Sequence, residues 1–144
     1  MKNITIKTIN PLKNIGKVKE LLLQLNPNKG ETHIEQLLKQ MHTYNNYNCF
    51  GLYKHNEIIG ISSGWTSIRI YCGKQLELDN VVIDKKLQSK GLGKIFLDKI
   101  EEWAIKEAYE SVTLNTYVSN SRSHKFYFNQ GFNILGFHFQ KLIK

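Results

Sequence analysis

The spacing of apolar residues in the first third of the chain predicts one strand followed by two helices. Residues 4–9 alternate imperfectly between apolar and polar types, as a short strand does. Asn14 is a candidate cap for a helix that continues to Leu25 with its apolar side chains on one face. Pro27 interrupts that pattern, and the same spacing then predicts a second helix over residues 31–41.

The apolar period changes to two after the second predicted helix, which indicates antiparallel strands. Residues 49–53 and 58–71 flank Lys54–Glu57, a credible hairpin turn. A second turn at residues 72–74 leads into a strand over residues 76–83.

The last third of the chain alternates between helix and strand. A helix is expected after a polar loop at residues 84–90, followed by a strand over 111–117 and a helix over 120–129. A partly alternating run over residues 132–143 predicts a final strand. The order β-α-α-β-β-β-α-β-α-β indicates the α/β (α+β) class, with one domain over residues 1–144 and helices on the faces of a mixed sheet.

Composition and cysteine content are those of an ordinary globular domain. The chain weighs 16.8 kDa and has 41% hydrophobic and 22% charged residues, which suits a single hydrophobic core. No apolar run approaches the ~18 residues of a membrane span, and no export signal is evident. We therefore expect a cytoplasmic protein without membrane contact. Cys49 and Cys72 are too few and too far apart for a disulfide framework or a zinc site, so no metal is expected.

The net charge of +8 invites comparison with nucleic-acid-binding proteins. All basic residues except Arg69 and Arg122 are lysines, however, and they are spread along the chain. Nucleic-acid readers favour arginine, and they interleave their basic clusters with aromatic residues. We therefore expect no nucleic acid partner, but a positive field that attracts other anions, such as a phosphorylated cofactor.

The most informative segment is residues 81–94, where a strand leads through a glycine-containing polar loop into a helix. Such a loop can turn several N–H groups toward a phosphate, and the helix N-terminus adds partial positive charge. Lys90 and Lys94 add formal charge. A Walker A loop is excluded because Ile95 stands where Ser or Thr is required, and a Rossmann fingerprint because Phe96 stands where a small residue is required.

The remaining pattern, Gln-x-x-Gly-x-Gly, is formed by Gln88, Gly91 and Gly93 directly after a strand. It resembles the acetyl-CoA loop of the GNAT superfamily of N-acetyltransferases. Residues 76–83 are similar to the family's fourth strand, and residues 120–132 to its Asn-…-Phe-Tyr-…-Gly-Phe segment. The resemblance implies a mostly antiparallel, twisted sheet of six to seven strands flanked by about four helices, with acetyl-CoA as the acetyl donor.

By this resemblance, main-chain groups hold the donor. The family's fourth and fifth strands splay apart at a bulge, and the pantetheine arm pairs with the exposed backbone. The N–H of Val82 is the expected donor to the acetyl oxygen. These strand residues can also serve as plain core, and Asn120 fits a helix N-cap equally well. The implied cofactor-binding residues are Val81, Val82, Ile83, Gln88, Ser89, Lys90, Gly91, Leu92, Gly93, Lys94 and Asn120.

Two carboxylates are candidates for the base that accepts the proton of an attacking amine. Alternation places Glu77 and Asp79 on one strand face with Val81 and Ile83. By the family's position, Glu77 is the better candidate and Asp79 the second. The alternative is an ordinary acid, solvated or paired with Arg69 across the sheet.

Tyr127 is the candidate general acid. It matches the position from which the family's tyrosine protonates the departing CoA thiolate. The alternative is a packing role, because Phe126 and Phe128 flank it in an aromatic run.

These features together predict an enzyme that transfers an acetyl group from acetyl-CoA to a primary amine of a small molecule or protein. Direct attack in a ternary complex is favoured, and residues 26–32 are expected to line the acceptor pocket by family analogy. A catalytically inactive acyl-CoA-binding module of the same fold is the alternative, and a small nucleic-acid-binding protein is the third. A monomer and a homodimer both remain open.

Overall fold

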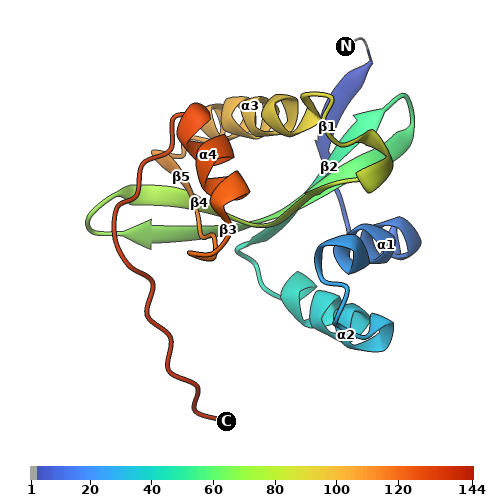
Figure 1. The fold of residues 1–144 in the computed structure, drawn as a ribbon, viewed down its shortest axis with the longest axis horizontal. Coiled ribbons are helices and arrows are strands. Elements are labelled where there is room, and N and C mark those ends of the chain that lie inside the picture. The colour runs from blue at the N-terminus through green and yellow to red at the C-terminus, as the bar shows by residue number, and fades with distance from the viewer. Residues whose placement is uncertain (1–2) are drawn as a thin grey trace.

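The structure, a computed structural model that describes residues 3–144, contains one five-stranded sheet in the order β1-β2-β3-β4-β5. Helices α1 and α2 cover one face of the sheet, and α3 and α4 cover the other (Figure 1). None of the helices within residues 3–144 is long and apolar enough to cross a membrane. The elements are β1 (Ile4–Thr8), α1 (Ile15–Leu25), α2 (Glu31–His42), β2 (Tyr47–Lys54), β3 (Glu57–Arg69), β4 (Gly73–Ile83), a 3-10 turn (Lys85–Leu87), α3 (Leu92–Lys106), β5 (Ser111–Leu114) and α4 (Ser121–Asn129).

Strands β1 to β4 pair antiparallel, as the short turns between β2, β3 and β4 require. Strand β5 pairs parallel with β4, because α3 carries the chain back along the sheet before β5 begins. The mixed sheet and the four helices confirm the predicted fold class.

Each face of the sheet has its own hydrophobic core. On one face, α3 packs Leu92, Phe96 and Ile100 against Phe50 and Leu76. On the other face, α1 and α2 bury side chains such as Val18 and Leu38 against β3 and the end of β4. Both cores come from the helical and alternating apolar positions that the sequence displays. The sheet is therefore fixed from both sides.

The predicted final strand over residues 132–143 is wrong. After Phe132 the chain leaves the body as an extended tail that belongs to no sheet (Figure 1). The described sheet accordingly has five strands, not the six to seven expected. Alternation predicts an extended backbone, but it does not supply a partner strand. Strand β5 also ends at Leu114, three residues before the predicted end.

The two N-terminal helices begin close to their predicted positions. Asn14 occupies the N-cap position of α1, but its side chain donates to the carbonyl oxygen of Asn10 (3.3 Å) instead of accepting from the helix. Gly30 precedes α2 and has no side chain with which to cap it. The helices are thus held by their buried faces more than by their caps.

Candidate active site

Strand β4 contains a β-bulge at Asn80. Its register with β3 pairs Ser63 with Asp79 and Ile61 with Val82, so β4 has one more residue than β3 between these pairs. Asn80 takes up the extra length in a left-handed conformation, with φ of 53°.

The bulge corrects the predicted placement of the two acids. Alternation is interrupted at Asn80, so Glu77 and Asp79 do not share a face with Val81 and Ile83. Val81 and Ile83 pack against the α3-side core, as Leu78 does. Val82 packs instead among the side chains of α1 and α2. The acids therefore project from the sheet face that α1 and α2 cover.

Beyond the bulge, β4 and β5 separate. Their parallel pairing ends at Leu78 and Leu114, which leaves residues 79–83 of β4 without a strand on that side. Residues along a strand turn their N–H and C=O groups to alternate neighbours. The N–H of Asp84 donates to Ile59 of β3 (2.9 Å), so Val82, two residues earlier, also faces β3.

This alternation reassigns the expected oxyanion donor. The N–H of Val82 belongs to the β3 ladder, whereas the main-chain groups of Val81 and Ile83 face the gap between β4 and β5. The edge of β4 therefore offers the main-chain groups of Val81 and the N–H of Ile83, two residues apart, which is the spacing with which an added strand, or an amide-containing arm, pairs; the Ile83 carbonyl oxygen already accepts from Gln88 Nε2.

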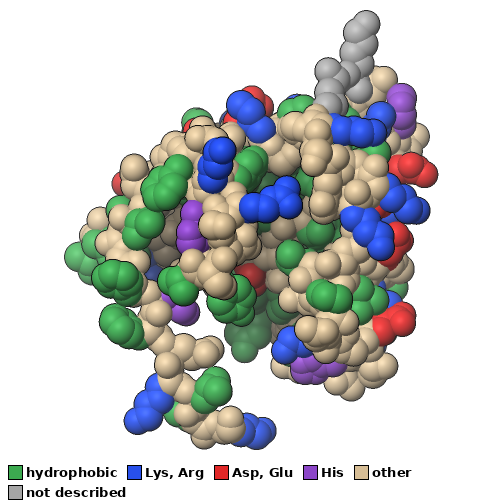
Figure 2. All heavy atoms as spheres, in the orientation of Figure 1, with side chains coloured by type: hydrophobic (Ala, Val, Ile, Leu, Met, Phe, Trp, Pro, Cys, Tyr) green, Lys and Arg blue, Asp and Glu red, His purple; other side chains and the backbone are tan. Residues whose placement is uncertain are grey.

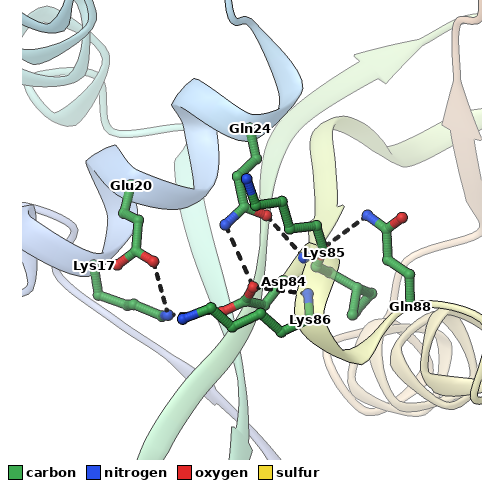
Figure 3. A network of polar contacts seen from close by, with 8 residues as sticks. Lys17, Glu20, Gln24, Asp84, Lys85, Lys86 and Gln88 are labelled. Atoms are coloured by element: carbon green, nitrogen blue, oxygen red, sulfur yellow. Dashed lines mark hydrogen bonds and ion pairs between the residues drawn. The ribbon is translucent and has the colours of Figure 1, made fainter.

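The loop that follows β4 is fastened to α1 by Asp84, which is almost fully buried (Figure 3). Its carboxylate accepts from Lys17 Nζ (2.9 Å), from the Lys86 N–H (3.2 Å) and from Gln24 Nε2 (3.4 Å). The Gln24 Oε1 in turn accepts from the N–H of Lys85 (2.9 Å). The hydrogen bond from Lys17 is the main reason that the pKa of Asp84 is lowered. The sequence analysis did not identify this network.

The next part of the loop has the backbone conformation that forms a concavity of N–H groups, called a nest. Ser89 (φ 63°) and Gly91 (φ 74°) are both left-handed, and α3 begins at the following residue. Within the described chain, no N–H from Gln88 to Lys94 has a hydrogen-bond acceptor. Backbone N–H groups in such a nest, at the start of a 15-residue helix, attract an anion.

The polar residues of this loop have separate structural roles. Gln88 donates from Nε2 to the carbonyl oxygen of Ile83 (3.1 Å), so its side chain holds the loop against β4. Lys94 pairs with Asp98 one turn along α3. Lys90 is exposed beside the concavity. Their main chain, more than their side chains, is available to a ligand.

The two loop glycines differ in purpose. A Cβ on Gly91 would meet no atom within 4 Å, so the positive φ, and not steric crowding, favours glycine there. A Cβ on Gly93 would lie 3.3 Å from the Phe126 ring. Gly93 thus allows α4 to approach the first turn of α3.

Tyr127 lies on α4 in the layer of partly buried side chains that also contains Val81 and Ile83. Its ring makes edge contacts with Phe126 and Phe132, with centroid distances of 5.2 and 5.5 Å. Burial raises the pKa of Tyr127, so its hydroxyl keeps its proton at neutral pH. The ring contacts fit the packing interpretation, and the general-acid role of Tyr127 stays a prediction.

The acids lie next to an aromatic group that the sequence analysis missed. Trp65 of β3 stands opposite Glu77, and its ring contacts Tyr47 at a centroid distance of 5.0 Å and Tyr44 at 6.1 Å. Desolvation raises the pKa of Asp79, although hydrogen bonds from the Asn80 backbone and the Trp65 side chain oppose the shift. The register of the β3–β4 hairpin, counted from its turn, could have revealed Trp65, because that register is unbroken from Arg69–Gly73 to Ser63–Asp79.

Three further expectations concern single residues. Arg69 pairs with Gly73 at the far end of the β3–β4 hairpin, away from Glu77 and Asp79, so the alternative of an ion pair between Arg69 and the acids is not observed. Asn120 caps α4, since its Oδ1 accepts from the Ser123 N–H (3.2 Å). Cys49 is buried in β2, which raises the pKa of its thiol to about 11.

A groove of about 190 Å³ opens on the α2 side of the sheet, beyond Tyr47. It is lined by Thr8, Ile9, Asn10, His42, Tyr47, Asn48 and Cys49. The loop over residues 26–32 does not contribute to it. Within residues 3–144, no three His, Cys, Asp or Glu side chains gather as a metal site would require.

Comparison with known proteins agrees with this geometry. The model of the acetyltransferase (GNAT) family matches residues 16–132, so the chain belongs to that family. It is 29% identical over 117 residues to the uncharacterized N-acetyltransferase YhdJ of Bacillus subtilis (strain 168), covering 78% of this chain and 82% of that protein.

Two solved structures show the same fold. A GNAT family acetyltransferase from Staphylococcus aureus subsp. aureus USA300_TCH1516 has a TM-score of 0.79 at 21% identity, covering 98% of this chain and 99% of that one. The aminoglycoside N-acetyltransferase AAC(6')-Iy, in complex with CoA, has a TM-score of 0.79 at 14% identity, covering 98% and 95%. At these identities the likeness concerns the fold.

Proposed function

We propose that this acetyltransferase uses acetyl-CoA and transfers the acetyl group to a primary amine by direct attack. One observation carries the proposal: a concavity of unpaired N–H groups, residues 88–94, lies directly after a strand whose Val81 and Ile83 backbone faces an open gap. A ligand with a diphosphate at one end and an amide-containing arm at the other satisfies both features.

The chain's groups fit the two parts of CoA separately. The N–H groups of Gln88 to Lys94, with the α3 N-terminus, bind the pyrophosphate. Val81 and Ile83 pair with the pantetheine amides as a neighbouring strand would. Asn120, as the α4 cap, holds the first turn of α4. Acetyl-CoA supplies an activated thioester, and the protein provides positioning and proton transfer.

The reaction requires an oxyanion donor, a base and an acid. The N–H of Val81 donates to the acetyl oxygen as negative charge develops there. Asp79 or Glu77 accepts the proton that the amine loses when its nitrogen bonds to the acetyl carbon. Tyr127 donates its proton to the sulfur as the carbon–sulfur bond breaks. The products are an amide and CoA.

The α1/α2 face suits a cationic acceptor. Glu77 and Asp79 attract an ammonium group, and the rings of Trp65 and Tyr47 offer π-faces that stabilise it further. Asp79 is the better-placed base, since it adjoins the bulge and desolvation raises its pKa toward the working range. Residues 26–32 remain the predicted rim of the acceptor pocket.

The experiment measures thiol release from acetyl-CoA with a panel of primary amines, together with thermal unfolding in the presence of CoA. We expect CoA to raise the melting temperature and at least one amine to give turnover. Stabilisation by CoA without turnover on any amine would identify a binding module instead of an enzyme. No stabilisation by CoA would overturn the assignment of the loop.

A further inference from the structure

The groove on the α2 side of the sheet lies in line with the proposed base. Across the sheet, Asp79 of β4 pairs with Ser63 of β3, and Ser63 pairs with Cys49 of β2. Cys49 is one of the residues that line the groove of about 190 Å³. Because neighbouring strands lie about 4.8 Å apart, the groove begins about 10 Å from Asp79. An acceptor whose amine reacts beside Asp79 therefore reaches the groove only if it is elongated.

Aromatic side chains occupy the interval between the acids and the groove. In the next row across the sheet, Trp65 stands between Glu77 and Tyr47, and Tyr47 also lines the groove. The Trp65 ring contacts those of Tyr47 and Tyr44. Figure 2 shows hydrophobic side chains in the hollow of the surface beside α1 and α2. Such rings favour an apolar spacer, for example a methylene chain, over a polar one.

The groove contains two carboxamide side chains whose hydrogen bonds are only partly used. The Oδ1 of Asn10 accepts from the N–H of Leu12 (2.9 Å), which leaves Nδ2 as a donor. The Nδ2 of Asn48 donates to the carbonyl oxygen of Gly64 (3.4 Å) and to Oγ1 of Thr66 (3.3 Å), which leaves Oδ1 as an acceptor. Both asparagines line the groove, so it offers one donor and one acceptor from side chains.

A carboxamide matches this pair of groups. The N–H of Ile9 donates to the carbonyl oxygen of Cys49 (2.8 Å), which brings the neighbouring Asn10 and Asn48 together. A carboxamide has an acceptor oxygen and N–H donors, so it can bond to both asparagines at once. A carboxylate has no donor for Asn48, and an ammonium has no acceptor for Asn10. No acid is among the described residues that line the groove, so nothing there favours a second ammonium.

We propose that the groove is the distal subsite for the acceptor, and that the acceptor is a linear primary amine with a methylene spacer of about 10 Å and a carboxamide at its far end. The amine lies at the two acids, the spacer lies on the aromatic rings, and the carboxamide bonds to Asn10 and Asn48. This assignment rests on the proposed function and adds the length and the end group of the substrate. The two asparagines determine specificity and take no part in the chemical step.

The first test compares acceptors that share an eight-carbon chain, about 10 Å long when extended, and differ only at the far end. The ends are a carboxamide (ω-aminocaprylamide), a carboxylate (ω-aminocaprylate), an ammonium (octamethylenediamine) and a methyl group (octylamine). We expect kcat/KM for the carboxamide to exceed each of the others by about ten-fold or more, because every other end leaves an asparagine group unpaired. Glycinamide, which is too short to reach the groove, should be as poor. Equal values across the ends, or across the two lengths, would overturn the proposal.

The second test changes the chemistry of the groove. Asn10→Asp keeps the acceptor for the Leu12 N–H but replaces the Nδ2 donor with a carboxylate oxygen. It should lower kcat/KM for ω-aminocaprylamide by about ten-fold and raise it for octamethylenediamine. Asn56→Asp makes the same change of charge in the exposed β2–β3 turn and should leave the order of the substrates unchanged. An unchanged order in Asn10→Asp, or the same change in both variants, would contradict the assignment. Thermal melts check that both variants fold.

Calorimetric titration of ω-aminocaprylamide into the CoA-bound protein separates this inference from the proposed function. Binding that Asn10→Asp weakens and Asn56→Asp does not, without turnover of any amine, would support the subsite and overturn the assignment as an enzyme. Turnover of amines without preference for length or end group would support the enzyme and overturn the subsite. Neither binding nor turnover of ω-aminocaprylamide would overturn the subsite as well.

Discussion

At the level of single residues, the β-bulge at Asn80 determines which main-chain groups lie beside Asp79. Asn80 is left-handed, and it shifts the alternation of the strand residues that follow it. Asp79 therefore lies two residues before Val81, whose amide faces the gap between β4 and β5. Without the bulge, Asp79 and Val81 would share a face, and Val81 would leave the α3-side core in which it packs.

The two candidate bases can be separated by isosteric substitution. We expect Asp79→Asn to lower kcat by about 10²-fold or more, because the proton of the amine then has no positioned acceptor. Glu77→Gln is the matched control and should lower kcat less. The pKa of Asp79 is raised above its ordinary value of 3.8. In the parent enzyme, kcat/KM should rise with pH as the Asp79 carboxyl loses its proton, and this rise should be absent in Asp79→Asn. If Glu77→Gln lowers kcat more than Asp79→Asn does, the base is Glu77.

The phenol of Tyr127 is tested by removing only its oxygen. Tyr127→Phe keeps the ring contacts with Phe126 and Phe132, so stability should change little, while kcat should fall by about 10²-fold with unchanged CoA affinity. Tyr109→Phe is the control: its hydroxyl bonds to Thr66 (2.6 Å) away from the site. That control should cost about 1 kcal/mol of stability and no activity. Equal kcat in both variants would leave Tyr127 a packing residue.

At the level of elements, the loop between β4 and α3 depends on a contact that is distant in sequence. Lys17 and Gln24 of α1 bind Asp84 and the adjoining backbone, so α1 helps to position the loop that we propose binds the pyrophosphate. The helix was predictable from the spacing of its apolar residues. Its polar residues, by contrast, follow no pattern that predicts a contact with Asp84.

We expect Asp84→Asn to destabilise the fold by about 1–3 kcal/mol at neutral pH, since it removes a charged, buried hydrogen-bond acceptor. Because folding lowers the pKa of Asp84, its contribution is present above the unfolded value of 3.8 and is lost as the pH falls through the lower folded value. Urea melts of the parent and variant should therefore converge at low pH. Asp98→Asn, which breaks an exposed pair, should change stability by less than about 0.5 kcal/mol.

Gly91, the N-cap residue of α3, provides a test of the loop between β4 and α3. Gly91→Val places a side chain in open space beside the N–H concavity, so CoA binding should weaken by an order of magnitude or more. Gly131→Val is a matched control: its φ is also positive, at 89°, and its Cβ also meets nothing within 4 Å. Both variants should lose about 1–3 kcal/mol to backbone strain. Isothermal titration with CoA that shows equal affinity in the two variants would place the pyrophosphate elsewhere.

At the level of the whole molecule, the net charge of +8 produces a positive electrostatic potential that attracts an anionic ligand. CoA affinity should therefore fall as salt is added, because screening shortens the reach of exposed lysines. Lys94→Gln at the start of α3 should reduce this salt dependence. Lys106→Gln, at the other end of the same helix, should leave it nearly unchanged. Titrations at several salt concentrations measure both slopes, and identical slopes would remove Lys94 from the site.

Much of the fold followed from local patterns. The stripe of apolar positions in α1, the alternation in β2 and β3, and the glycines before α3 each act over a few residues, and each predicted its element. The family resemblance rested on the same local loop. The expected strand over residues 132–143 failed because pairing depends on a partner, and the partner is not encoded by alternation.

The sequence by itself determined the order of the elements, their amphipathic faces and the loop chemistry, because helix period, strand alternation and glycine conformation are properties of neighbouring residues. Only the tertiary structure decided which face holds Glu77 and Asp79, which amides face the gap, that Trp65 stands beside the acids and that α1 anchors the loop. Each of these depends on strand register, on the bulge at Asn80 or on packing between distant segments, none of which local patterns encode.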